Sequence, residues 1–500
     1  MADTTVAAGR GVIHIAIAKA YFMVAGYVIQ FILPRLLHSD VAWGHYQLVV
    51  RLVSVIDNVI ITGTIQGVSK FTAQAEEMVD GVKLAALKVQ ALLGGGIAVI
   101  YVALAPWISR RQGVPTLTSL YQLSAGIMIC YAFYAVFVGS LNGLKRFGRQ
   151  AALDMTFATL RAILILGGVL AGWGVAGAIS GFVGAAALIL VISMVIVGLP
   201  RRSSPFSTSH LWRYLPPVLL YTLTLNLIMT IDLILLPRFV GQISGMTDGV
   251  GRFALVSSYA GYYGTAQLLA FIPYQAIIAV AFVVFPLVSK STFENDLAQT
   301  QRYIRQTLRL SLIFSAGIAA VFMSNPAAVI NVVFPTQFRI GGPALRVLSA
   351  GMICFSMFAI INTILNSAGK TMQALGSGIV TLGLTAGANV VFVPMSATPE
   401  TSLATAAIAS SAAMALGVLL SAVLLFRSFH AGFPAASVVR VVLAVAVVFV
   451  VGRFIPELSR LLTLGECVLL FLLYYVLLAV MREFGPQDLA SFRRVLFRGK

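Results

Sequence analysis

Several ionisable residues lie within stretches of the chain that are otherwise apolar and helix-forming. Five of them are Lys19, Arg51, Asp57, Arg161 and Asp232. A charge near the centre of a bilayer costs at least about 2.5–3.5 kcal/mol, so such a side chain usually faces a water-filled cavity or a partner. Because three of the five are cationic, the set indicates a path for an anionic substrate. The structural alternative for each residue is pairing across helices or snorkelling to the membrane interface.

The apolar segment that begins at residue 41 carries a row of polar residues, each three or four positions after the last. At about 100° per residue, this spacing keeps them on one side of a helix. The row consists of Gln47, Arg51, Ser54, Asn58, Thr62 and Gln66. Such a row either holds a helix against its neighbour or lines water, and the arginine favours water. We therefore predict that this row binds substrate through Gln47, Arg51 and Asn58. Lys19, an intramembrane cation in the preceding apolar segment, is predicted to bind substrate with them.

A second row, Tyr259, Tyr263, Gln267 and Tyr274, lies on one side of the segment 252–289. Aromatic faces could stack on sugar rings while hydroxyl and amide groups form hydrogen bonds, which makes Tyr263 and Gln267 further candidates for substrate binding. A tyrosine row that packs between helices is the alternative.

The two intramembrane aspartates, Asp57 and Asp232, are candidates for ion coupling. A carboxylate inside a membrane can exchange protons as a cavity opens and closes, and sodium is an alternative ligand for Asp232. Each could instead neutralise an arginine or lysine on another helix. Asp154 and Arg161 are seven residues apart on one helical face, so a structural charge pair is expected there.

Composition assigns the chain to the polytopic helical membrane proteins. Its apolar fraction is 59% and its charged fraction 10%, against roughly 45–50% and 25% in soluble domains. Fourteen apolar runs are long enough to span a bilayer as helices. They are 11–33, 41–65, 84–108, 118–143, 151–172, 174–199, 214–240, 252–289, 303–333, 343–368, 371–395, 400–427, 436–455 and 462–482. The first run is too long for a signal-peptide core and is expected to remain as a span.

The net charge of +18 is distributed by topology and does not indicate nucleic-acid binding. With the N-terminus in the cytoplasm, most Lys and Arg residues fall in cytoplasmic connections, which supports a cytoplasmic location for both termini. Cys130, Cys354 and Cys467 are scattered singly, and the histidines show no ligand spacing. No metal site and no cofactor are predicted.

Four short segments of the first six spans recur, in the same order, six spans later. Ile32–Leu36 corresponds to Leu235–Phe239, and Gly44-His45-Tyr46 to Gly261-Tyr262-Tyr263. The other pairs are Leu141–Lys145 with Leu365–Lys370, and Val175–Ile179 with Ala404–Ile408. Because six is even, the halves share one orientation and are expected to be related by an axis along the membrane normal. The prediction is two six-helix lobes, 1–200 and 201–430, followed by two helices and a basic tail in 431–500.

These segments resemble the polysaccharide flippases of the multidrug/oligosaccharidyl-lipid/polysaccharide exporter superfamily, which also contains the lipid II flippases. The resemblance covers about residues 10–430. It is carried by Leu33–Leu37 with Gly44-His45-Tyr46, by Asp232, by Gly261–Ala266 with Phe285-Pro286, and by Leu365–Lys370. It implies an inner-membrane flippase, not an enzyme, that moves an undecaprenyl-diphosphate-linked oligosaccharide by alternating access, as a monomer among membrane lipids.

Four alternatives to this flippase remain, one of which is a structural or scaffold role that would leave the polar row of residues 47–66 unexplained. Lipid II flippases carry cationic residues on helices one, two and eight, and this chain has Lys19 and Arg51 but Gln267 at the third place. A cation-coupled multidrug exporter would need carboxylates where this chain has cations. A membrane enzyme that uses the same lipid would need a sizeable extramembrane loop, and the predicted connections are short.

Overall fold

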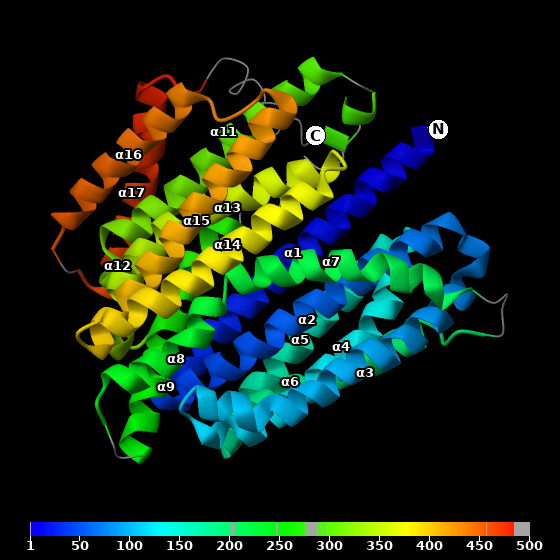
Figure 1. Cartoon of the computed structure of the whole chain (residues 1–500), viewed down its shortest axis with the longest axis horizontal. Coiled ribbons are helices and arrows are strands. Elements are labelled where there is room, and N and C mark those ends of the chain that lie inside the picture. Colours follow the sequence, from blue (N-terminus) through cyan, green and yellow to red (C-terminus); the bar gives the residue numbers. More distant parts are fainter. Residues whose placement is uncertain are drawn as a thin grey trace. The chain divides into compact units, whose positions relative to one another are not determined.

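The computed structural model describes residues 2–201, 206–246, 249–275, 277, 288–289, 291–294, 296–456 and 458–484; in the first helix, its side-chain details cover residues 14, 15 and 17–37. All regular structure in these residues is helical, as predicted (Figure 1). Much of the second half of the expected span 252–289, including Phe285-Pro286, lies outside the described residues, as does the tail from residue 485.

The chain divides into two compact units. The first unit comprises Met1–Gly264 with Ala397–Pro399, and the second comprises Thr265–Ser396 with Glu400–Lys500. The helices of the first unit are α1 (Ala2–Leu37), α2 (Asp40–Gln74), α3 (Val79–Arg111), α4 (Thr118–Gly143), α5 (Phe147–Gly168), α6 (Gly174–Val197), α7 (Thr208–Ile228), α8 (Ile231–Ile243) and most of α9 (Gly249–Ala270).

Helix α2 is central to the first unit, where it packs along α4 and α7 (Figure 1). Glycines permit the close approach of α4. A Cβ atom on Gly143 would lie 2.6 Å from the Cβ of Thr72, and one on Gly139 would lie 2.8 Å from the Cβ of Val68. Small residues at these contacts let the helix backbones approach each other, as is common in membrane bundles. Residues 43–72 of α2 are consequently buried at many positions, and its polar row runs from the buried Gln47 to the exposed Asn58 and Gln66.

Helices α5 and α6 form a packed hairpin. Gly172 (φ 86°) and Gly174 (φ 54°) turn the chain with backbone angles that glycine adopts without a steric penalty. A Cβ atom on Gly168 would lie 2.2 Å from the carbonyl oxygen of Gly177, so only glycine fits where the two helices touch. The continuous helical stretch Phe147–Val197 of 51 residues is therefore two helices, close to the predicted runs 151–172 and 174–199.

The second unit contains the end of α9 and the helices that follow it. They are α11 (Leu297–Ser324), α12 (Pro326–Val333), α13 (Gly342–Ser367), α14 (Thr371–Phe392), α15 (Pro399–Phe429), α16 (Ala435–Arg453) and α17 (Arg460–Val480). Helix α11 packs along α13 and α16. A core that includes Ile313, Val441 and Tyr474 joins α11, α16 and α17.

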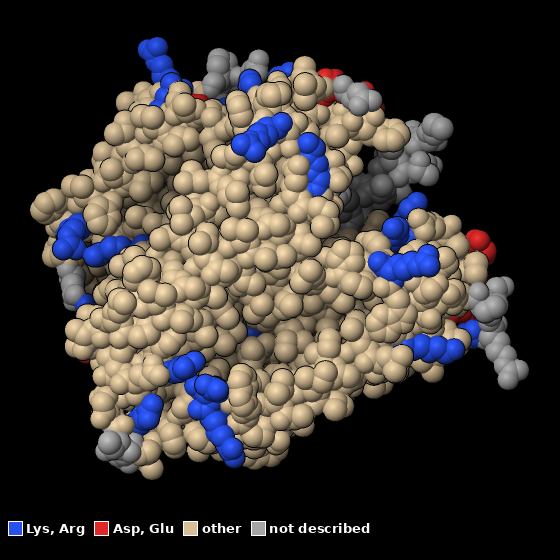
Figure 2. Space-filling model, viewed as in Figure 1, with Lys and Arg blue, Asp and Glu red and all other residues tan. Residues whose placement is uncertain are grey.

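The chain is a multi-pass membrane protein. Among the described residues, 11 helical segments are long and apolar enough to cross a membrane, or up to 12 when the bent pair α7–α8 counts as one span. Large apolar side chains are exposed on the outer surfaces of both units, for example Leu92, Val195 and Leu461. Figure 2 shows a face made mostly of uncharged residues, with Lys and Arg in small groups. Such a surface suits contact with lipid.

Candidate functional site

The polar row of α2 begins with a chain of amides that leads to Arg51. The Nε2 atom of Gln47 donates to Oε1 of Gln30 on α1 at 3.0 Å, and Nε of Arg51 donates to Oε1 of Gln47 at 3.3 Å. Gln47 is 1% exposed, whereas Arg51 is half-buried. Because the Gln47 amide donates through its nitrogen to Gln30 and accepts through its oxygen from Arg51, it holds the guanidinium of Arg51 in one orientation.

The charge of Arg51 also acts on Asp232, at the start of α8, and on Tyr27 of α1. Asp232 is 1% exposed; it accepts a hydrogen bond from the Tyr263 hydroxyl at 2.6 Å and another from the Leu233 amide at 2.8 Å. The first unit therefore gathers an arginine, a carboxylate and amides from α1, α2, α8 and α9 into one buried polar group. We call Gln30, Gln47, Arg51, Asp232 and Tyr263 the Arg51 cluster.

Glycines bring α9 against α2 beside this cluster. A Cβ atom on Gly44 would lie 1.7 Å from the carbonyl oxygen of Ser257, and one on Gly261 would lie 3.1 Å from the Gly44 amide nitrogen. Gly264 leaves space for Gln47 in the same way, at 3.2 Å from its Cγ. The two segments that the internal repeat matches, Gly44-His45-Tyr46 and Gly261-Tyr262-Tyr263, thus contact each other.

Asp57 has a different environment from Asp232. Its side chain is 3% exposed, and neither carboxylate oxygen has a hydrogen-bond partner. Its charge acts on Tyr101 of α3 and on Cys130 and Tyr131 of α4. A buried carboxylate in such surroundings is costly when ionised, because nothing replaces the water that solvated it.

Arg161 of α5 lies among aromatic rings. Its guanidinium carbon is 4.6 Å from the ring centre of Phe22 and 5.6 Å from that of Phe182, and the side chain also contacts Tyr131. Cation–π contacts of this kind stabilise a desolvated arginine by about 2 kcal/mol or more. The expected charge pair between Asp154 and Arg161 is not formed.

Asp154 has other partners. It accepts a hydrogen bond of 3.4 Å from the Tyr134 hydroxyl, and the charge of Lys19 on α1 acts on it. Seven residues of helix separate Asp154 and Arg161 by about 10 Å along the axis, which lets each side chain find a nearer neighbour on another helix. Lys19 is exposed. Because Lys19 precedes Gln30 by eleven residues, it lies about 16 Å along α1 from the end that holds Arg51.

The remaining predicted residues divide between exposed and buried positions. Asn58 is exposed, and its Nδ2 donates to Oδ1 of Asn226 on α7 at 3.2 Å. Tyr263 is fully buried and Gln267, one turn later on α9, is 1% exposed. In this conformation neither side chain presents a surface on which a sugar ring could stack.

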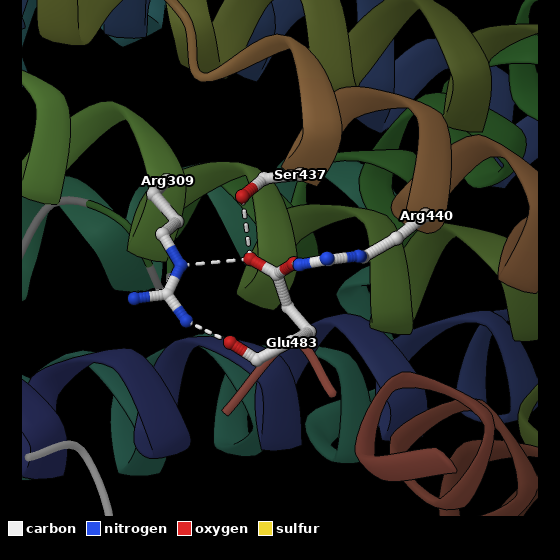
Figure 3. Close-up of polar contacts among 4 residues, drawn as sticks. All are labelled: Arg309, Ser437, Arg440 and Glu483. Atoms are coloured by element: carbon white, nitrogen blue, oxygen red, sulfur yellow. Dashed lines mark hydrogen bonds and ion pairs between the residues drawn. The ribbon is translucent and has the colours of Figure 1, made fainter. Parts of the chain in front are cut away.

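Two polar features of the second unit were not anticipated from the sequence. Glu466 of α17 is 5% exposed and has no hydrogen-bond partner at either oxygen. Glu483, just after α17, is held by three side chains (Figure 3): Nε of Arg309 at 2.7 Å, Oγ of Ser437 at 2.6 Å and a terminal nitrogen of Arg440 at 2.8 Å. An ionisable residue in an apolar run is the signal that could have identified Glu466.

Burial alone would raise the pKa of Glu483. Hydrogen bonds from Arg309, Ser437 and Arg440, together with the charge of Arg309, outweigh burial and hold this pKa below its usual value. In the described part of the chain, no group of three or more His, Cys, Asp or Glu side chains could hold a metal ion.

The comparison with protein families finds one match: the family described as Polysaccharide biosynthesis protein matches residues 8–292. No curated protein sequence matches the chain. Among solved structures, the chain is similar to the lipid II flippase MurJ in an inward closed conformation, with a TM-score of 0.67, 15% identity, and coverage of 92% of this chain and 99% of that chain.

Two further structures share the fold. One is an inward-facing multidrug resistance MATE family transporter of the MOP superfamily, with a TM-score of 0.62, 14% identity, and coverage of 79% of this chain and 95% of that chain. The other is a MOP superfamily transporter from Pyrococcus furiosus, described by the reverse polarity of its binding pocket, with a TM-score of 0.60, 15% identity, and coverage of 84% and 96%. The chain therefore shares its fold with the lipid II flippase MurJ and with these two MOP superfamily transporters.

Proposed function

We propose that this chain, which belongs to the polysaccharide biosynthesis protein family and shares its fold with MOP superfamily transporters, flips a polyprenyl-diphosphate-linked oligosaccharide across the bacterial cytoplasmic membrane. The observation that carries this proposal is the Arg51 cluster: a half-buried guanidinium, held by amides, inside an apolar helix bundle. Flipping needs no covalent chemistry, only a polar path for the charged headgroup while the isoprenoid tail stays in lipid.

Arg51 is suited to the diphosphate of such a lipid. A guanidinium presents five N–H donors in a planar fork that matches phosphate oxygens, and charge-assisted hydrogen bonds of this type are about twice as strong as neutral ones. One Arg51 nitrogen is committed to Gln47. That hydrogen bond orients the side chain in advance, so less conformational entropy is lost when a phosphate binds.

Asp232 competes with the substrate for Arg51 in this proposal. Without substrate, the carboxylate supplies a negative charge near the guanidinium and is itself held by the Tyr263 hydroxyl. A diphosphate that binds Arg51 carries more negative charge than Asp232 and replaces it as the partner of the guanidinium. The negative charge of the diphosphate then makes it more costly to keep Asp232 ionised and favours protonation of Asp232. Substrate entry and proton uptake would then be linked at one cluster.

Asp57 is the second coupling residue that we propose. It lies six residues from Arg51 on the same helix, is buried without a hydrogen-bond partner, and has tyrosines rather than basic groups as its known electrostatic neighbours. A carboxyl group in that environment is more stable neutral, so it would hold a proton in this conformation and release it when water reaches α2.

The transporter is expected to have fourteen spans, counted as α1–α6, bent α7–α8, the segment that begins with α9, α11, and α13–α17. Both termini would lie in the cytoplasm, and the protein would act as a monomer by rocking two six-helix lobes, 1–200 and 201–430. The contact between Gly44 and the segment Ser257–Gly261 supports this symmetry, because repeat-related elements meet at a two-fold axis.

A lipid II flippase is the second candidate, since a lipid II flippase is among the structures with the same fold. Lys19, which that reading would require in the cavity, lies near Asp154. This placement favours a different lipid-linked glycan. A multidrug exporter for cations fits less well. Asp232, the carboxylate nearest the proposed substrate site, has its negative charge balanced by Arg51.

Flipping of a fluorescent polyprenyl-diphosphate oligosaccharide in proteoliposomes tests the proposal. Loss of Arg51 removes one charge-assisted contact worth about 1.5–3 kcal/mol, so Arg51→Ala should slow flipping roughly ten- to hundred-fold. The control is Arg427→Ala, which removes an exposed arginine at the end of α15. Normal flipping by folded Arg51→Ala would exclude Arg51 as the headgroup ligand. Competition with lipid II distinguishes the two candidate substrates.

A further inference from the structure

Helix α11 breaks inside the second unit at Asn325. This residue has φ −132° and ψ 67°, and Pro326, which lacks an N–H group, begins α12. At this break, carbonyl groups at the end of α11 and N–H groups at the start of α12 lack hydrogen-bond partners within their own helix. On the α11 side, Nε of Arg346 donates to the carbonyl oxygen of Met323 at 3.1 Å, and the Ser324 hydroxyl donates to that of Val321 at 2.7 Å.

On the α12 side, the first turn has no side-chain cap. Asn325 occupies the N-cap position, but its side chain accepts no hydrogen bond from the turn that follows. The amides of Ala327 and Ala328 precede the first residue that can bond within the helix, since the Val329 amide donates to the Asn325 carbonyl. A helix start of this kind attracts negative charge.

Glu466 lies beside this helix start. The buried residues of α17 are Thr463, Glu466, Leu470, Tyr474 and Leu478, so the carboxyl group takes a core position on a face that is otherwise mostly apolar. One turn further along that face, Leu470 contacts Gly452 of α16, which in turn touches Ser324 at the end of α11. The Asn325 side chain is a polar neighbour of Glu466 and interacts with its carboxyl group, but neither carboxylate oxygen has a partner at close hydrogen-bond distance.

The surrounding charges do not neutralise Glu466. Helix α12 carries no ionisable residue; the basic residues of the adjoining elements are Arg346 of α13, Arg453 at the end of α16 and Arg460 at the start of α17. Arg346 is directed to the Met323 carbonyl, and no ion pair joins Glu466 to any of the three. A buried carboxylate without an ion pair or a hydrogen-bond donor is expected to bind a cation or a proton.

We propose that Glu466 is a proton-binding site of the C-terminal helices, separate from Arg51 and Asp57. A proton fits better than a metal ion, because sodium requires several oxygen ligands and the groups seen here are one carboxylate and one amide. Loss of the proton would leave a charge next to the uncapped amides of Ala327 and Ala328. The carboxylate would then cap α12, and the angle between α11 and α12 would depend on whether Glu466 holds its proton.

Labelling with dicyclohexylcarbodiimide tests this site directly, since the reagent modifies protonated carboxyl groups in apolar surroundings. The purified full-length protein in detergent is labelled at several pH values, and modified peptides are identified by mass spectrometry. Glu466 should be modified at low pH, with labelling falling about tenfold per pH unit above its midpoint. Glu483, which is held by two arginines, is the internal control and should remain unmodified.

Two variants and one salt exchange make the test decisive. Glu466→Gln should abolish modification of that peptide, whereas Cys467→Ser should retain it, which excludes the neighbouring thiol as the target. Replacing potassium chloride with sodium chloride should have no effect. Protection by sodium would overturn the proton assignment in favour of a metal-ion site, and absence of labelling at every pH would overturn the site itself.

This inference rests on the proposed function only in treating the protein as an ion-coupled transporter. Labelling requires neither substrate nor transport, so it can succeed where the flipping assay fails. In the flipping assay, Glu466→Gln should reduce dependence on an imposed proton gradient while leaving substrate affinity unchanged. If gradient dependence is unaltered but Glu466 is labelled, the site binds a proton without coupling it to transport, and that part of the proposal is wrong.

Discussion

Helix α2 in the first unit and helix α14 in the second each carry a row of polar residues at helical spacing, but the two rows contact different things. In α2, Gln47 and Arg51 lead from a buried amide to a half-buried guanidinium, and Asn58 is exposed. In α14, Ser377, Thr381, Thr385 and Asn389 recur every four residues, and all four are buried.

The α14 row makes its hydrogen bonds within the helix bundle. Thr381 and Thr385 donate to the carbonyls one turn earlier, and the Thr381 side chain fills the space next to Gly417 of α15. Ser377 donates to Asn362 of α13, and Asn389 donates to Ser410 of α15 at 2.9 Å. Small hydroxyl and amide groups of this kind hold membrane helices together. The α2 row differs because it includes the charge of Arg51 and the exposed side chain of Asn58.

The largest expected effect concerns the charges in the Arg51 cluster. Asp232→Asn removes the carboxylate beside Arg51 and should lower the free energy of unfolding by about 3 kcal/mol, since an uncompensated buried charge remains. The double variant Asp232→Asn with Arg51→Gln should recover part of that loss. The stability of both single variants and of the double variant is measured by thermal unfolding in detergent.

Asp57→Asn is the matched control for this double-mutant cycle of Arg51 and Asp232, because Asp57 has no hydrogen bond to lose. Its stability should equal or exceed that of the parent chain near neutral pH, where the amide stands in for a protonated carboxyl group. Strict additivity of Arg51→Gln and Asp232→Asn would show that the two side chains do not interact.

The next largest effect concerns Glu483, which, unlike Asp57, forms ion pairs with two arginines. Glu483→Gln should cost about 1.5–3 kcal/mol, because hydrogen bonds from Arg309 of α11 and Arg440 of α16 to a charged group are lost. The pKa of Glu483 is held below its usual value. Its contribution is therefore complete above the unfolded pKa of about 4.3 and is lost as the pH falls through the folded value.

Thermal unfolding between neutral and acidic pH checks both the size and the sign. The variant should approach the parent chain in stability as the pH falls. Glu400→Gln, at an exposed position in the first turn of α15, is the control and should leave the profile unchanged. A gap between parent and Glu483→Gln that widens on acidification would contradict the ion pairs.

A smaller effect is expected where the α14 row touches α15. A Cβ atom on Gly417 would lie 2.5 Å from Oγ1 of Thr381, so Gly417→Val should destabilise the protein by about 1–3 kcal/mol through overpacking. Flipping per folded molecule should be unchanged. Gly383→Ala on α14 is the control, because nothing lies within 4 Å of the added methyl group. Slow flipping by folded Gly417→Val would place this interface in the transport machinery.

The helical fold and the position of Arg51 follow from periodicity and composition. Apolar run length determines where the helices lie, and glycine spacing marks the turn at Gly172–Gly174. The polar spacing of α2 likewise predicted that Gln47 and Arg51 share a face, and the structure shows them hydrogen-bonded.

The contacts that a side chain makes with other helices could not be predicted from residue spacing within its own helix. Asp154, on the same helix, was the predicted partner of Arg161, but Arg161 contacts Phe22 and Phe182 instead. A search for opposite charges does not consider aromatic rings, so it misses these contacts. The same spacing occurs in α2 and α14, so period alone does not separate a path for substrate from a helix contact. What separates them is the chemistry of the side chains and their exposure.

The smallest expected effect distinguishes the two rows at a single amide. Asn58→Ala removes one partly exposed hydrogen bond to Asn226 and should cost at most about 0.5–1 kcal/mol of stability. Because Asn58 is exposed on the polar face of α2, the same change should still slow flipping severalfold. Asn389→Ala on α14, where the amide is buried against Ser410, should show the reverse: a larger loss of stability and unchanged flipping. If both variants lose stability equally and neither alters flipping, the polar row beyond Arg51 holds α2 against α7 and the path for the headgroup ends at the arginine.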